Sequence, residues 1–289
     1  MNILLRELRA NFKSLLIWSG IALLFVTVGF SKFSAYEGNP ELVAILNNFP
    51  PALVEAFNLN AFNLTTITGF FGVMFSYFGL ILSISAAMWG TDIITKEERD
   101  KTVEFSLTLP VTRSKLVTGK ILAMVVDSII LLFVTWGSIL LNATAYETDS
   151  KFFEFVSLCM LALFIMQMIF LAIGVFLGCA MTHYKRASSL AVSVLLGTYF
   201  LSVISGMNEN LDFLKYFSPF KYFNPGVMLN EAKMDAAYLA LSAGIIVVSL
   251  VAGYFFYSKR DLYIESRPIT KAEKVNRDAA IVSRISVFI

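Results

Sequence analysis

The sequence is poor in charged residues for its length. Only 15% of its 289 residues are Asp, Glu, Lys or Arg, and 57% are hydrophobic, whereas soluble domains carry about 25% charged residues. This shortage of charge excludes an ordinary soluble domain, and the mean hydropathy of +0.72 agrees. The net charge of +2 is too small to favour nucleic acid as a partner. The composition therefore predicts a polytopic membrane protein, whose main surroundings are the lipid bilayer.

Residues that hold metals or form disulfides are equally scarce. The single histidine, His183, has no neighbouring Cys or His, so we expect no metal site. The two cysteines, Cys159 and Cys179, fall in one predicted helix. At 1.5 Å per residue they lie about 30 Å apart, too far for a disulfide, and small packing residues are the simpler interpretation.

Motifs for catalysis are also missing. Gly119 and Lys120 are followed by Ile121 and lack the preceding glycine of a phosphate-binding loop, Gly-x-x-x-x-Gly-Lys-Ser/Thr. The Gly-x-Ser-x-Gly and His-Glu-x-x-His patterns of hydrolases do not occur either. We therefore expect no enzymatic activity and no cofactor in this chain.

Long apolar runs are what the sequence does contain. A helix that crosses a bilayer needs about 20 mostly apolar residues. Six runs meet this condition, at residues 15–33, 66–89, 116–143, 155–180, 187–205 and 237–257. The expected fold is an all-α polytopic membrane protein, with a six-span domain over residues 15–263. Gly174 and Gly178 have the spacing typical of closely packed membrane helices.

Polar segments precede and follow the six spans. Residues 1–14 predict an amphipathic helix, with Leu5, Leu8 and Phe12 on one face and basic residues on the other. Such a helix is typical of the membrane interface. Residues 264–289 form a basic tail.

Lysine and arginine are almost absent from every second polar segment. Of the chain's 23 basic residues, none occurs in residues 34–64, one in 146–154 and three in 206–236. Eighteen fall in residues 1–14, 91–120, 182–186 and 258–289. Because basic residues favour the cytoplasmic side of a membrane, we expect both termini and residues 91–120 to be cytoplasmic.

Residues 91–120 hold the largest group of charges between two spans. Residues 92–100 are expected to continue the second span as a charged helix, and Thr112 or Ser114 to cap the third. Residues 102–109 lie between them and place apolar side chains outside the bilayer. Either lipid headgroups or a groove on a partner protein would cover these side chains.

Two polar residues lie deep inside apolar runs. Asp127 falls within the third span, where a charge costs about 2.5–3.5 kcal/mol and marks a candidate functional site. It is either an ion or substrate contact or a structural residue that reaches the interface or hydrogen-bonds to a serine of another helix. Gln167, in the fourth span, is more typical of an interhelical hydrogen bond.

The boundary of the third span resembles a known family. Leu109-Pro110-Val111-Thr112-Arg113, followed by Gly119-Lys120, is similar to a pattern at this position in the permease subunits of type-2 ABC exporters. Ser218-Pro219-Phe220 and Lys259-Arg260-Asp261-Leu262, on either side of the last span, support the resemblance. It covers about residues 1–263.

The resemblance implies partners and a role for each segment. A permease of this family pairs with a second copy or a related permease in the cell membrane. It binds two cytoplasmic ATPase subunits, which hold ATP and Mg²⁺. Residues 91–115 would be the coupling segment, residues 1–14 an interfacial elbow helix, and residues 206–236 short re-entrant helices.

Candidate site residues follow from this resemblance. The candidate ATPase-coupling residues are Glu97, Glu98, Lys101, Glu104, Phe105, Leu107, Leu109, Pro110 and Arg113. The candidate residues of the translocation path are Asp127, Phe71, Phe75, Phe78 and Gln167. Simple packing explains the three phenylalanines equally well.

Two other interpretations stay open at this point. The protein is alternatively an ion-coupled secondary transporter, with Asp127 as the coupling group and no ATPase. A third interpretation is a membrane scaffold or sensor whose 91–120 segment binds a signalling protein. The substrate cannot be inferred from these residues.

Overall fold

The computed structural model describes residues 3–37, 39, 54, 62–102, 111–181, 183–207 and 209–259. Every regular element in this part of the chain is a helix. Six are long and apolar enough to cross a membrane: α1 (Ile3–Phe33), α4 (Ile67–Arg99), α6 (Arg113–Ala143), α7 (Ser150–Ala180), α8 (Tyr184–Ser205) and α11 (Ala236–Lys259). The predicted all-α, six-span fold is confirmed.

The first helix differs from the prediction. Residues 1–14 and 15–33 were expected as two helices, but Ile3–Phe33 is continuous over 31 residues. The predicted boundary rested on a change in amphipathicity, and neither proline nor glycine occurs there to interrupt the helix. A helix of this length spans about 46 Å, against about 30 Å for the hydrocarbon core of a bilayer. A position of residues 1–14 in the membrane interface stays a prediction.

Polar caps begin three of the long helices, and at the start of α4 the Thr66 hydroxyl accepts from Gly69 N at 3.2 Å. The Thr112 hydroxyl accepts a hydrogen bond from Lys115 N at 3.4 Å at the start of α6, which confirms one of the two predicted caps. Asp149 Oδ1 accepts from Phe152 N at 2.9 Å at the start of α7. These side chains satisfy backbone N–H groups that have no partner within the helix.

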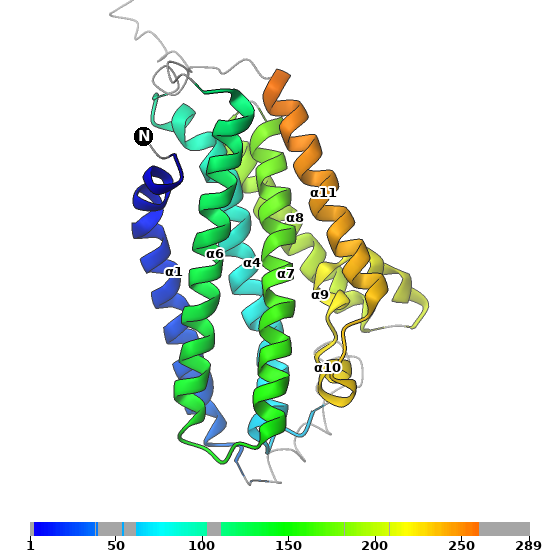
Figure 1. Ribbon diagram of the computed structural model, residues 1–289. Coiled ribbons are helices and arrows are strands. Elements are labelled where there is room, and N and C mark those ends of the chain that lie inside the picture. The colour runs from blue at the N-terminus through cyan, green and yellow to red at the C-terminus, as the bar shows by residue number, and fades with distance from the viewer. Residues whose placement is uncertain are drawn as a thin grey trace, which may run out of the picture.

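α4 and α7 form the centre of the bundle (Figure 1). α4 packs most extensively on α7, while α1 packs on α6, α8 on α4 and α11 on α7. A Cβ added to Gly90 would lie 2.5 Å from the Leu171 carbonyl oxygen, and one added to Gly174 would lie 2.5 Å from that of Ala87. The two backbones therefore touch. Gly178 also faces α4, so the predicted packing role of Gly174 and Gly178 is confirmed.

Both ends of the described chain lie at one end of the bundle (Figure 1). The start of α1, the end of α4, the start of α6 and the end of α11 are found there. We call this the terminal end. The arrangement agrees with an even number of spans, and its placement in the cytoplasm stays a prediction from the charge distribution.

Short helices join α8 to α11 within the described residues. They are η2 (Glu209–Phe217), α9 (Pro219–Tyr222) and α10 (Pro225–Glu231). Pro219 and Pro225 stand at the first positions of α9 and α10, where the missing N–H of proline needs no partner. The short helices predicted in residues 206–236 are therefore present, and their depth in the membrane stays a prediction.

Candidate functional site

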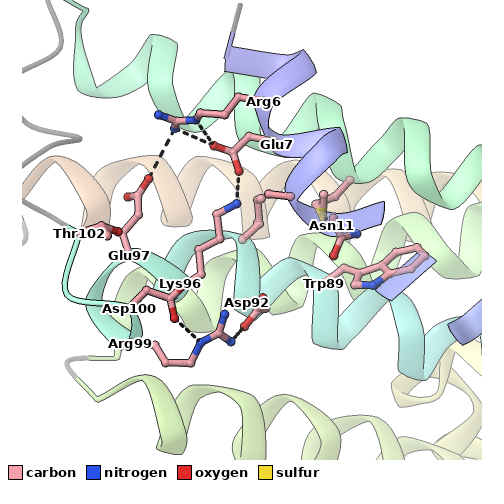
Figure 2. Close-up of a pocket in the computed structure, with 13 residues that line it drawn as sticks. Arg6, Glu7, Asn11, Trp89, Asp92, Lys96, Glu97, Arg99, Asp100 and Thr102 are labelled. Carbon is pink, nitrogen blue, oxygen red and sulfur yellow. Dashed lines mark hydrogen bonds and ion pairs between the residues drawn. The ribbon is translucent and has the colours of Figure 1, made fainter. Parts of the chain in front are cut away.

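Charged side chains join α1, α4 and α6 at the terminal end of the bundle, and Figure 2 shows those of α1 and α4. Glu7 of α1 forms ion pairs with Lys96 of α4 and with Arg6, whose Nη2 lies 2.7 Å from Glu7 Oε1. Arg6 Nη2 also lies 3.7 Å from Glu97 Oε1. On the other side of Glu97, the Lys120 Nζ of α6 lies 2.7 Å from Oε2. We call these five residues the ionic network.

Burial makes this pairing important. Lys120 is 0% exposed, Glu7 1% and Glu97 8%. A buried charge loses its hydration, and removal of its partner leaves that loss without compensation. Each of these three charges faces an opposite charge from another helix. The network therefore holds α1, α4 and α6 in one arrangement.

A cleft of about 340 Å³ opens beside the ionic network. Asn11 and Trp89 line one part of it, and Asp100 and Thr102 line another, as Figure 2 shows. Its described lining carries charges of both signs, from Arg6, Lys96 and Arg99 and from Glu7, Asp92, Glu97 and Asp100. The cleft therefore suits helix anchoring and contact with charged groups.

The end of α4 is built onto the same network. Lys101 adopts a left-handed conformation with φ of 57°, and Thr102 N donates to the Glu97 carbonyl oxygen at 2.8 Å. The residue in this left-handed conformation at a helix end is usually glycine, so the backbone of Lys101 is under some strain. The chain leaves α4 at this point and enters the connection to α6. Glu97 thus anchors that connection through both its side chain and its backbone.

Two hydrogen bonds continue the contacts of α1 deeper in the bundle. Asn11 Nδ2 donates to Asp127 Oδ2 at 2.6 Å, and Trp89 Nε1 donates to Ser14 Oγ at 2.8 Å. Asp127 therefore has a hydrogen-bond partner on another helix. The partner is an asparagine, whereas the sequence analysis considered a serine. Gln167 is fully buried, and its amide group has no hydrogen-bond partner among the described residues. A role of either residue in transport stays a prediction.

The predicted coupling residues separate into three groups. Glu97 is turned into the ionic network, while Glu98 is half-buried. Lys101 and Arg113 are exposed at the two ends of the connection, and Arg113 Nη1 donates to the Ser258 carbonyl oxygen of α11 at 3.4 Å. The other predicted residues lie outside the described part of the chain: Glu104, Phe105, Leu107, Leu109 and Pro110.

The predicted path phenylalanines are packed inside the subunit. Phe71, Phe75 and Phe78 are 1%, 2% and 3% exposed. The Phe71 ring centroid lies 5.8 Å from that of Phe155 on α7, and Phe78 lies 5.6 Å from Phe25 on α1. These are ordinary aromatic packing distances. Packing accounts for the three residues in this conformation, and lining a path stays a prediction.

Sequence analysis missed several members of this site. Glu7 stands among the basic residues of the first helix, and its partner Lys96 is 89 positions away. Asn11 and Asp127 are 116 positions apart. One sequence signal could have indicated such a pairing. A single glutamate in a basic helix needs an opposite charge once packing buries it.

Comparisons with known proteins agree with the architecture. A family model described as ABC-2 family transporter protein matches residues 1–262, which include all six long helices. No curated protein matches the chain.

Proposed function

The chain belongs to the ABC-2 transporter family, and from this premise we propose that it is the permease subunit of an ATP-driven exporter. As a family member with six apolar helices it is a multi-pass membrane component of a transporter. The proposal adds a separate cytoplasmic ATPase, bound through the 91–115 coupling segment, and outward transport. Two ATPase subunits bind the ATP and Mg²⁺, and a second copy or a related permease completes the complex in the cell membrane.

The anchoring of the coupling segment is the observation that carries this proposal. Thr102, the last described residue before residues 103–110, is held by the Glu97 backbone, and the Glu97 side chain is held by Lys120 and Arg6. A displacement of the segment is therefore passed on to α6 and α1 as well as α4. A scaffold that merely displays a binding loop would not need buried ion pairs at its base.

The mechanism follows from this connectivity. ATP binding closes the two ATPase subunits, and their closure moves the coupling segments. Packed helix ends held by discrete ion pairs move together rather than bend individually. The α1, α4 and α6 group then shifts the permease between inward-facing and outward-facing states. In this scheme Lys101, Arg113 and residues 103–110 contact the ATPase, and Glu97 is a positioning residue.

Purification of the intact complex tests the ATPase partner. We expect gentle affinity purification from membranes to retain an ATPase subunit and vanadate-sensitive ATP hydrolysis. Phe105→Asp should remove both, because a carboxylate cannot enter an apolar groove, while Phe105→Leu should retain them. Transport by the purified chain on a proton or sodium gradient alone would contradict the proposal. If Asp127→Asn abolished that gradient-driven transport, the interpretation as an ion-coupled secondary transporter would replace the proposed exporter.

A second experiment separates coupling from binding. Glu97→Gln removes the charge that pairs with Lys120 and Arg6 but leaves the backbone contact to Thr102. We expect the ATPase to remain bound while its hydrolysis in proteoliposomes falls about tenfold, equivalent to about 1.4 kcal/mol of activation free energy. Asp100→Asn is the matched control, because Asp100 lies at the same end and, among the described residues, its ion pair is with its neighbour Arg99. Wild-type hydrolysis by Glu97→Gln would mean that the network does not transmit the motion.

A further inference from the structure

Three lysines gather at one cavity, away from the terminal end. The cavity has a volume of about 370 Å³ and lies where the end of α8 meets η2, α9, α10 and the start of α11 (Figure 1). Lys215, Lys221 and Lys233 line it. In the polar segments assigned to the outer side, the sequence has just one more basic residue, Lys151, which does not line this cavity. Basic residues are normally scarce on that side, so their concentration here needs an explanation.

The described lining of the cavity is cationic in sum. Asp235 is the acidic residue among the lining residues, against three lysines. Tyr222 adds no negative charge: burial, with a smaller contribution from Tyr238, raises its pKa to about 12. Its hydroxyl donates to the Tyr216 carbonyl oxygen at 2.6 Å. A cavity with this lining favours an anionic group.

The tyrosine rings give the cavity a firm wall. The ring of Tyr222 is stacked on that of Tyr238, with centroids 5.2 Å apart and an interplanar angle of 11°. Tyr222 belongs to α9 and Tyr238 to α11, so this stack joins two of the elements that surround the cavity. Lys221, next to Tyr222 in α9, is therefore presented by a packed framework.

The lengths of α8 and α11 indicate the depth of the cavity. The two helices have 22 and 24 residues, which correspond to about 33 and 36 Å. The hydrocarbon core of a bilayer is about 30 Å thick. α8 runs from the terminal end to the cavity and α11 runs back, so the cavity lies at the level of the opposite headgroups. Lipid phosphate is the abundant anion at that level.

We propose that this cavity binds the phosphate of an anionic lipid headgroup through Lys215, Lys221 and Lys233. Lysine is a strong point-charge ligand for phosphate. Lys221 also lines a smaller cavity of about 40 Å³ with Tyr77 and Tyr199, between α4 and α8. It therefore stands between the headgroup site and the interior of the bundle. The proposal concerns binding alone and does not depend on ATP-driven export.

Lipid binding by the purified full-length protein tests the site. The measurement is native mass spectrometry in mixed micelles with phosphatidylglycerol, phosphatidylcholine or soluble glycerol phosphate. We expect phosphatidylglycerol to bind more tightly than phosphatidylcholine. Each Lys→Gln substitution should weaken it roughly fivefold, as expected for one basic residue beside an anionic surface. Glycerol phosphate that binds as tightly as the lipid would identify a free phosphate ester as the source.

Matched variants keep the test decisive. Lys151→Gln, on the same side but outside the cavity, should bind phosphatidylglycerol as the wild type does. The variant with arginine at all three positions should retain binding. If the variant with glutamine at all three lysine positions fails to fold, Lys233→Gln alone tests the site. Lys233 is exposed, so its replacement should not disturb packing. Unchanged binding after removal of the cavity lysines, or an equal loss in Lys151→Gln, overturns the proposal.

Discussion

The two ends of the bundle place their charged residues differently. At the terminal end, Glu7, Glu97 and Lys120 are buried and paired across α1, α4 and α6. Beside α9 and α10, the lysines surround a cavity, and Lys233 is exposed. The first arrangement holds long helices together, whereas the second places lysines around an open cavity.

This difference indicates that the two sets of charges have different roles. Buried ion pairs lose much when one partner is removed, so they specify one arrangement of helices. Charges at an accessible cavity contribute little to stability and keep their capacity to bind an anion. We therefore expect substitutions at the terminal end to affect folding and coupling, and substitutions at the cavity to affect ligand binding.

The largest expected effect is that of Lys120→Met. It removes the partner of Glu97 on α6, so we expect the free energy of unfolding to fall by about 3 kcal/mol. This value is at the lower end of the range for broken buried ion pairs, because Glu97 still has Arg6 as a partner. Denaturant unfolding in detergent measures it. Lys233→Met at the cavity should change stability by less than about 0.5 kcal/mol. Similar losses in both variants would remove the contrast between the two ends.

Gly90→Ala tests the core that both ends share. The added methyl would meet the Leu171 carbonyl oxygen at 2.5 Å, so α4 and α7 must separate. We expect a loss of about 2 kcal/mol, with weaker lipid binding and weaker ATPase coupling in the same variant. Gly137→Ala is the control, because its added Cβ has nothing within 4 Å. A Gly90→Ala protein as stable as this control would show that the contact between α4 and α7 can accommodate the added methyl group.

Asn11→Ala tests the deeper contact between α1 and α6. It leaves the buried Asp127 carboxyl without its donor, and we expect a loss of about 1–2 kcal/mol in the free energy of unfolding. Asp127→Asn should cost less, because an amide oxygen still accepts from Asn11. Thermal unfolding of the two variants side by side provides the measurement. The reverse order would mean that the charge of Asp127 matters more than its hydrogen bond.

Tyr222→Phe should have a smaller effect than Asn11→Ala. It removes one hydrogen bond, to the Tyr216 carbonyl oxygen, at a cost of about 1 kcal/mol, and preserves the stack on Tyr238. Thermal unfolding and ATP hydrolysis should show a slightly less stable protein with normal coupling. Tyr222→Leu, which also loses the stack, should be less stable. Impaired coupling in Tyr222→Phe would link the cavity wall to the terminal end.

Local features of this protein were predictable from sequence. The six apolar runs, the Thr112 cap and the contact role of Gly174 depend on residues near one another in the chain, and the structure confirms them. Residues 1–14 and 15–33 were predicted as separate segments, whereas the structure has one continuous helix there, because a change of amphipathic face does not interrupt a helix.

The candidate site was predictable only in part. Glu97 was identified as important, yet as an exposed contact, and the structure shows it buried against Lys120 and Arg6. Its partners come from other helices, so their approach depends on how each helix is rotated and packed.

Composition and periodicity alone determined that this chain is helical and has six segments long and apolar enough to cross a membrane. These properties follow from hydrophobicity and backbone hydrogen bonding, which act over a few residues. Tertiary structure decided that Glu7 meets Lys96 and that three separate lysines share one cavity. Ion pairs and cavities require side chains from distant segments to meet, and helix packing alone sets that geometry.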